Sequence, residues 1–409
     1  MRLLCRYRGR RFFLYDCRIT PSRHERLVSA TIMPRWVHQT IRIGGGQGYD
    51  RKTLSLIQGP WTEETKPFQP LKATMPEPPY PLHPSVTDRI NPEYKDFYNK
   101  HVIDKQVVHH QPISVSRASG TLIPGAGPKL PVASARDFHI PRRETSGPDI
   151  LVRAFTPIGD KPESGWPLCI WFHGGGWVLG NIDTENVIAT HLSNRAKCVT
   201  ICVDYRLAPE DPFPAAIDDC WESLLWAIST GADELGLDTS RIALSGSSAG
   251  GNLTSVLCQR ATTRSDIPPI KLQLLSVPVA DNTAVVESSD PAHASWKENE
   301  FTPALPAEKM MWYRYHYLPK REDWAHPEAS PLLWKGDWFL LPPAVIVVGE
   351  MDVLRSEGEA LGNKLSDAGV AVDLHVMKGQ PHPFIAMDEA LEDGRRAITL
   401  FVDKIVELL

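Results

Sequence analysis

A five-residue pattern near the middle of the chain carries the clearest chemical potential. Residues Gly246-Ser247-Ser248-Ala249-Gly250 match G-x-S-x-G, directly after an apolar stretch and directly before a helical pattern. In such a strand, turn and helix, the glycines permit a sharp turn that leaves the central serine hydroxyl clear of the backbone. The context therefore predicts that Ser248 is a nucleophile.

A serine nucleophile needs a general base, and the base needs a carboxylate that holds it in one tautomer. When the serine stands on this kind of turn, the acid and then the histidine follow it along the chain. Asp352 and His382 each come just after an apolar run that is predicted to be a strand. We expect a catalytic triad of Ser248, Asp352 and His382, with Glu350 as the alternative acid.

A second glycine-rich segment, His173-Gly174-Gly175-Gly176-Trp177, follows another apolar run. Backbone N–H groups that are not shielded by side chains can stabilise the negative charge on a carbonyl oxygen under attack. We assign this oxyanion hole to the N–H groups of Gly174, Gly175 and Ala249. A phosphate-binding loop is the rival interpretation, but neither the Lys-Ser/Thr pair nor the G-x-G-x-x-G spacing is present. His173 is expected to support the loop structurally.

The elements that must position these residues begin near Val132. The candidate strands are 133–140, 150–156, 167–173, 197–204, 241–246, 271–279, 343–349 and 371–377. Continuous apolar runs such as 168–172 are typical of strands buried on both faces of a parallel sheet. Helical patterns alternate with them, and the clearest begins at Pro214. The pattern predicts an α/β fold with a mostly parallel, eight-stranded, doubly wound sheet.

Two segments outside this alternation predict a helical cap. The interval 281–340 is rich in large aromatic rings, so we expect an insertion folded over the carboxyl edge of the sheet, where ligands bind in open α/β folds. Tyr94, Phe97, Tyr98 and Val102 fall at helical spacing, which predicts an amphipathic helix over about 91–108.

Three parts of the chain are therefore expected. Residues 1–43 form an Arg-rich extension, either disordered or a targeting segment, although Met33 could instead be the true start. Residues 44–130 form an N-terminal arm with the cap helix, and 131–409 form the catalytic domain. The expected location is the cytoplasm, with mitochondria as the alternative.

Composition bounds the kinds of partner. The net charge of −5 over 409 residues argues against nucleic acid as a partner, and the chain has no apolar run of the roughly 18 residues that a membrane span needs. The seven cysteines show no close spacing and are expected to be reduced, with those inside apolar segments buried. His109-His110 has no further ligand at metal-binding spacing, so no metal is expected. A homodimer remains open.

These segments together resemble the hormone-sensitive lipase family of α/β-hydrolases, which includes carboxylesterases and arylacetamide deacetylase. The resemblance spans about 170–385 and is highly specific. Its residues are His173 to Trp177, Asp204-Tyr205-Arg206-Leu207-Ala208-Pro209-Glu210, Phe213-Pro214-Ala215-Ala216, Gly246 to Gly250, Asp352-Val353-Leu354 and His382. It implies an α/β-hydrolase fold with a cap, and a serine esterase that acts on short- to medium-chain acyl esters without a metal or organic cofactor.

Two positions depart from many members of that family. Ser247 precedes the nucleophile where many relatives have Asp or Thr, and Pro383 follows the histidine where many have Gly. Because proline restricts the residue before it, Pro383 raises the question of whether His382 is placed correctly.

The sequence favours a carboxylesterase whose substrate is a small-molecule ester. Two alternatives stay open at this stage. One is an amide deacetylase that uses the same triad, and the other is a hydrolase-fold protein that binds a ligand without turnover.

Overall fold

The structure of this protein is a computed structural model, which describes residues 80–118 and 124–409 in full, and the backbone of five short strands in residues 1–43. The chain divides into two units, Met1–Thr74 and Met75–Leu409. In the first, β1 (Leu3–Tyr7) pairs antiparallel with β2 (Arg10–Leu14). The other three strands, β3 (Arg18–Thr20), β4 (Arg26–Ser29) and β5 (Thr40–Ile43), form an antiparallel sheet. The predicted boundaries at 43 and 130 remain predictions.

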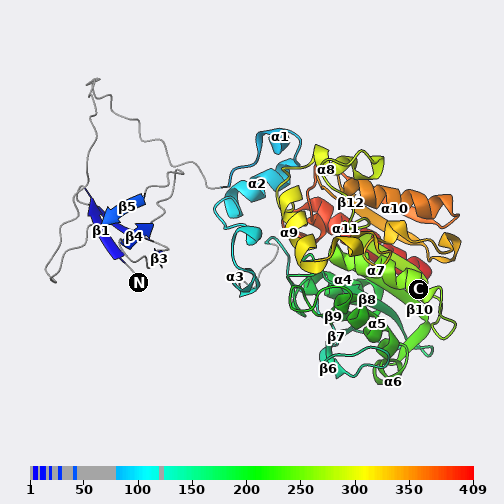
Figure 1. Ribbon diagram of the computed structural model, residues 1–409. Helices are drawn as coiled ribbons and strands as arrows, with labels where there is room; N and C mark the ends of the chain where they lie inside the picture. Colours follow the sequence, from blue (N-terminus) through cyan, green and yellow to red (C-terminus); the bar gives the residue numbers. More distant parts are fainter. Residues whose placement is uncertain are drawn as a thin grey trace. The chain divides into compact units, whose positions relative to one another are not determined.

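The second unit is built on one eight-stranded sheet (Figure 1). Its order is β13-β12-β11-β10-β8-β9-β7-β6, and only the pairings of β7 with β6 and with β9 are antiparallel. The strands are β6 (Ser134–Ile140), β7 (Ile150–Thr156), β8 (Trp166–Phe172), β9 (Val199–Asp204), β10 (Leu237–Ser247), β11 (Leu272–Ser276), β12 (Ala344–Gly349) and β13 (Val372–Met377). The predicted α/β-hydrolase fold with a mostly parallel sheet is confirmed.

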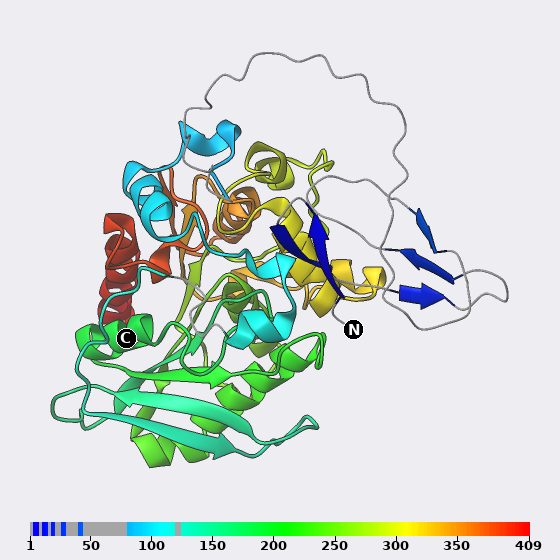
Figure 2. The same ribbon diagram turned by 90° about the vertical axis from the view of Figure 1, so that its left-hand side faces the viewer.

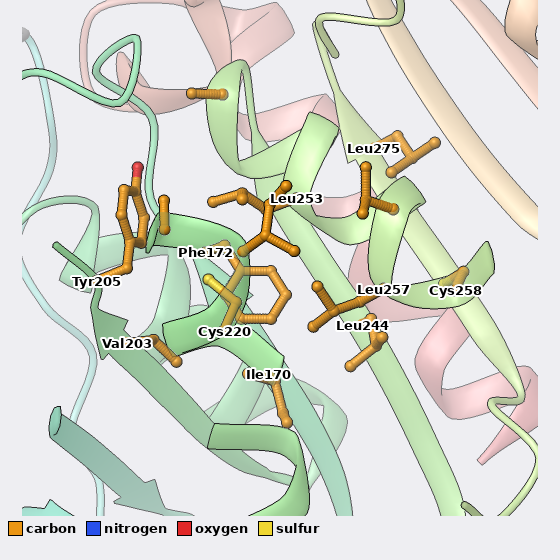
Figure 3. Close-up of a cluster of buried hydrophobic side chains, with 14 of the residues drawn as sticks. Ile170, Phe172, Val203, Tyr205, Cys220, Leu244, Leu253, Leu257, Cys258 and Leu275 are labelled. Atoms are coloured by element: carbon orange, nitrogen blue, oxygen red, sulfur yellow. The ribbon is translucent and has the colours of Figure 1, made fainter. Parts of the chain in front are cut away.

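Strand β8 shows why continuous apolar runs mark the centre of this sheet. All of its residues are buried, because successive side chains point to opposite faces and both faces are covered. Ile170 and Phe172 belong to the core on one face, whereas Cys169 and Trp171 belong to the core on the other. Figure 3 shows the first of these cores, with Phe172 beside Leu253 of a covering helix.

Helices cover both faces of the sheet. Their bounds are α4 (Asn186–Ala196), α5 (Ala215–Ala227), α6 (Thr230–Leu235), α7 (Ala249–Ala261), α10 (Arg355–Asp367) and α11 (Glu392–Leu408). The apolar residues of α4 and α11 join one core, and those of α5, α7 and α10 join the other. Helix α5 begins at Ala215, one residue after the predicted start, and Pro214 is its N-cap residue. The sheet is therefore doubly wound.

Two segments lie beside each other at the carboxyl edge (Figure 1 and Figure 2). The first contains α1 (Pro84–Thr87), α2 (Pro92–His101), η1 (Val108–His110) and α3 (Ile113–Ala118). The second is the aromatic-rich insertion, with η2 (Pro291–His293), α8 (Ala294–Glu298), α9 (Ala307–Tyr317), η3 (Arg321–Ala325), η4 (Pro331–Leu333) and η5 (Trp338–Leu340). Arg89 joins them, because its guanidinium donates to Asn299 Oδ1 and to the Glu298 carbonyl. We call these two segments together the cap.

The predicted helix over 91–108 is too long. Asn91 caps the helix through its side chain, as an N-cap residue should, but the helix ends at His101. Val102 and Ile103 pack against the apolar core, and Val102 has left helical backbone geometry. Val102 therefore packs against the core from outside the helix, although its spacing fits the helical pattern.

Cys169, Cys198, Cys202, Cys220 and Cys258 are buried free thiols, as expected. The Cys5 side chain and the whole of Cys17 lie outside the part of the chain that the structure describes. Within the described part of the chain, no helix combines the length and apolar character that a membrane crossing requires.

Candidate active site

Ser248 occupies the turn between β10 and α7. Its φ of 57° is positive, which is uncommon for a residue with a side chain, and its N–H donates to the Ser276 carbonyl. A Cβ at Gly250 would overlap the Phe172 carbonyl oxygen, so only glycine allows helix and strand to approach this closely. Ser248 is 6% exposed, and its place on a tight, strained turn agrees with the predicted nucleophile position.

The structure brings His382 and Asp352 together from two neighbouring strand ends. Asp352 follows β12 and His382 follows β13, and His382 Nδ1 lies 2.7 Å from Asp352 Oδ2. The second carboxylate oxygen of Asp352 accepts the Leu354 N–H at 3.0 Å. Asp352 is fully buried, so its carboxylate is held in one orientation toward the imidazole.

Glu350, the alternative acid, faces elsewhere. Its carboxylate accepts from the Gly379 N–H at 2.8 Å and from Lys378 Nζ at 3.0 Å. The bond between His382 and Pro383 is a cis peptide bond, and the imidazole reaches Asp352 with the proline in place. The geometry therefore favours Asp352 as the acid.

The glycine loop after β8 differs in one respect from the prediction. The Gly174 N–H, which the sequence assigned to the oxyanion hole, donates to Glu185 Oε2 at 3.1 Å and is therefore engaged in this structure. The N–H groups of Gly175 and Gly176 have no acceptor among the described residues. Gly176 has a φ of 60°, and a Cβ there would overlap the Tyr313 ring. The adjacent amides, Gly175 and Gly176, are the ones left available.

One cavity of about 860 Å³ joins these parts. Ser248, His382 and the three loop glycines all line it, and so do residues from both segments of the cap. Its apolar lining comes mainly from the cap and includes Leu82, Tyr98, Val108, Leu305, Met310 and Tyr313. Such a volume is typical of a pocket for a small organic ligand.

The comparisons with known proteins agree with this geometry. Residues 169–386 match the family model described as alpha/beta hydrolase fold. An AB hydrolase superfamily protein of Schizosaccharomyces pombe is 50% identical over 321 residues, which cover 77% of this chain and 93% of the relative. An arylesterase of Saccharolobus solfataricus is 34% identical, over 72% of this chain and 92% of its own. The chain belongs to the α/β-hydrolase fold family.

The solved structures lead to the same family. The esterase of Pyrobaculum calidifontis is 30% identical, with a TM-score of 0.67, and the match covers 78% of this chain and 98% of that one. The expected resemblance to the hormone-sensitive lipase branch is confirmed, and this member of the family is a hydrolase.

Glu185 is a site residue that the sequence did not reveal. Its carboxyl oxygen Oε2 accepts the Trp171 indole N–H at 3.0 Å as well as the Gly174 N–H, so it ties the glycine loop to β8. Burial raises the pKa of Glu185 to about 7, against the opposing effect of these hydrogen bonds. Its two partners precede it by 14 and 11 residues, so the contacts depend on how the chain turns between β8 and α4, and no motif marks this role.

His173 is structural, as expected. Its Nδ1 lies 2.6 Å from the Gly174 carbonyl, its ring stacks on Tyr205 with centroids 4.3 Å apart, and the Tyr205 hydroxyl donates to the His173 carbonyl. Burial lowers the pKa of His173 to about 4, so the ring is neutral near pH 7. Arg206, in the same predicted turn, pairs with buried Asp219. These contacts support the loop, and His173, Tyr205 and Arg206 are not among the residues that line the cavity.

The described residues include one group of three side chains of metal-ligand type. Ligand-type atoms of His109, His110 and Glu308 lie within 4.8 Å of one another. The ammonium group of Lys309 lies close enough to help lower the pKa of His109, after the larger effects of burial and of His110. A nearby positive charge opposes the binding of a cation, so the group is a poor metal site.

The cap also supports the acid loop, which the sequence did not indicate. Asn299 Nδ2 donates to the carbonyls of Glu350 at 3.0 Å and Asp352 at 2.9 Å. The Thr302 hydroxyl donates to the Met351 carbonyl. Three consecutive carbonyls of the acid loop are thus held by the insertion.

Proposed function

We propose that this protein is a serine carboxylic-ester hydrolase that forms an acyl-enzyme from short- to medium-chain acyl esters of a small molecule. The observation that carries the proposal is the 2.7 Å contact between His382 and Asp352, at the cavity that Ser248 also lines. The esterase names of the relatives support the ester as the bond that is cleaved.

In the proposed first half-reaction, Ser248 Oγ attacks the ester carbonyl carbon while His382 Nε2 accepts the serine proton. The imidazolium then gives that proton to the leaving alkoxide, and the acyl group stays on Ser248. Asp352 keeps the Nδ1–H of His382 directed toward itself and stabilises the imidazolium. In the second half-reaction, water attacks the acyl-enzyme, with His382 again as base, and releases the acid.

The negative charge on the carbonyl oxygen needs donors that are free before the reaction. We assign these to the N–H groups of Gly175, Gly176 and Ala249, because the Gly174 N–H is bound to Glu185. Ala249 is the first residue of α7, so its N–H has no partner within the helix. Loss of one such donor typically lowers turnover about 100- to 1,000-fold.

The test is hydrolysis of 4-nitrophenyl esters with acyl chains from acetyl to octanoyl, followed by release of nitrophenolate. The proposal expects saturable turnover, with the highest kcat/KM for a chain of short or medium length. The matched nitroanilide amides, measured in parallel, separate an esterase from an amide deacetylase. No turnover of any ester above the rate without protein would reject the proposal.

A further inference from the structure

Basic side chains outnumber carboxylates among the described residues that line the cavity. Lys105, Lys309 and His109 line it, and the one carboxylate among the described lining residues belongs to Glu185. Glu185 is engaged beneath the glycine loop by Trp171 and Gly174. A largely apolar pocket whose lining carries two lysines and no free carboxylate is suited to an anionic ligand. The carboxylate of Glu308 is outside this lining, exposed, and 3.8 Å from His110 Nε2.

Lys309 is the central feature of this asymmetry. It lies in the first turn of α9 and is partly buried, and burial lowers its pKa to about 8, so the ammonium form still dominates near pH 7. Nζ donates to the Ala304 carbonyl at 2.6 Å. Within the described ranges no carboxylate pairs with it. An ammonium group has three N–H donors, so two remain for a ligand.

His109, which lines the same cavity and is close enough to Lys309 to interact with it electrostatically, supplies a second polar atom. Its Nδ1 is buried and has no hydrogen-bond partner among the described residues. The pKa of His109 is lowered to about 4, first by burial and then by His110 and Lys309, so the imidazole is neutral near pH 7. A neutral imidazole with its proton on Nδ1 can donate one hydrogen bond to an anionic oxygen.

The Tyr313 ring lies near both Lys309 and the glycine loop of the candidate active site. Lys309 Nζ lies 5.9 Å from the centroid of the Tyr313 ring. That ring lies directly against Gly176, where a Cβ would overlap it. The ammonium and the glycine loop are thus both next to the Tyr313 ring, and all three line the same cavity.

We propose that Lys309, assisted by His109, is an anion subsite that binds a carboxylate on the substrate, so that the preferred substrates are esters of acids bearing a second, free carboxylate. The inference deepens the proposed function and rests on it. A half-ester of a linear dicarboxylic acid has this chemistry, with an ester carbonyl at Ser248 and a carboxylate at the far end of an apolar chain.

Two substrates of nearly equal size test the charge alone, namely monomethyl adipate and dimethyl adipate. Release of methanol is measured at pH 7 for the wild type and for Lys309→Met. The substitution should lower kcat/KM for the monoester about 10- to 100-fold, the usual worth of a hydrogen bond to a charged group, and change the diester less than about twofold. Lys309→Arg should recover part of the loss. Lys297→Met, at an exposed lysine outside the cavity, should match the wild type.

Equal losses for both esters, or no loss for the monoester, would overturn the anion subsite while leaving the esterase proposal in place. Failure of the wild type to hydrolyse either ester would count against the proposed function. Binding to Ser248→Ala then tests the subsite without turnover. Calorimetry should show that monomethyl adipate binds Ser248→Ala at least tenfold more tightly than the Ser248→Ala/Lys309→Met double variant, and equal affinities would overturn the proposal.

Discussion

Asn299, in the cap, donates a hydrogen bond of 2.9 Å to the backbone carbonyl of Asp352, the residue that orients the candidate base. The same side-chain nitrogen reaches the Glu350 carbonyl, and Arg89 holds Asn299 from the other side. The acid loop is therefore fixed in part by the cap as well as by the sheet. The segment that lines the cavity thus also helps to position the candidate acid.

Asn299→Asp should separate this role from packing, because the side chain keeps its size and loses its N–H donors. Two carbonyls would lose their partners and face a carboxylate, so the free energy of unfolding should fall by about 2 kcal/mol or more. We expect kcat to fall at least tenfold with KM little changed. Urea unfolding and ester kinetics on the same preparations check this. Wild-type values of both quantities would show that Asn299 does not support the acid.

Asp352→Asn should lower kcat by several orders of magnitude, because a neutral amide does not stabilise the imidazolium and favours the wrong tautomer. Glu350→Gln should lower it much less, since Glu350 contacts Lys378 and Gly379 and does not contact His382. Kinetics of the two variants on one ester decide between the carboxylates. A larger loss in Glu350→Gln would reverse the assignment.

Glu185→Gln should make the protein's stability less dependent on pH. The pKa of Glu185 is raised to about 7 from an ordinary value of 4.5, so the folded state binds the proton more tightly than the unfolded state. The wild type should therefore lose up to about 3 kcal/mol relative to Glu185→Gln as pH rises from about 4.5 to 7. Urea unfolding at pH 5 and pH 8 measures the difference. A difference that does not change with pH would contradict the buried, high-pKa carboxyl.

The same variant should keep most of its ester turnover. One oxygen of Glu185 accepts both the Trp171 and Gly174 N–H groups, and a glutamine amide oxygen at that place can accept both. Glu185→Met, whose thioether sulfur is only a weak acceptor, should instead lose at least tenfold in kcat because the glycine loop is released. If both variants behaved alike, the hydrogen bonds would not be what positions the loop.

The sequence predicted the features that depend on residues close to one another along the chain. Buried strands are read from continuous apolar runs, and the order of Ser248, Asp352 and His382 places all three at strand ends. The sequence did not predict contacts that depend on the folded chain. The Gly174 N–H was assigned to the oxyanion hole because nothing near it in sequence marks Glu185 as its acceptor. Likewise, the spacing of Val102 fits a helix, but α2 ends at His101, and Val102 and Ile103 pack against a core that only the folded chain creates.

Two truncations test the role of the N-terminal part of the cap. Removal of residues 1–74, a separate unit, should leave ester turnover nearly unchanged. Removal of residues 1–110 also deletes α2, whose buried Tyr94 and Tyr98 line the cavity. The longer truncation should aggregate more readily and discriminate less between acetyl and hexanoyl esters. Solubility and the ratio of the two rates are the measurements. Equal behaviour of the truncations would show that α2 does not close the pocket.

The central claim is that Ser248 is the nucleophile, and it is tested most directly by hydrolysis of 4-nitrophenyl butyrate by the wild type and by Ser248→Ala side by side. Loss of the nucleophile from a working triad typically lowers kcat about a million-fold. The kcat of Ser248→Ala should therefore be about one millionth of the wild-type kcat, apart from the small residual rate that the binding pocket alone supports. Its unfolding curve should still be cooperative, which shows that the fold is intact. A folded Ser248→Ala protein that keeps more than a few per cent of the wild-type rate, roughly 10,000-fold above this expectation, would contradict the account.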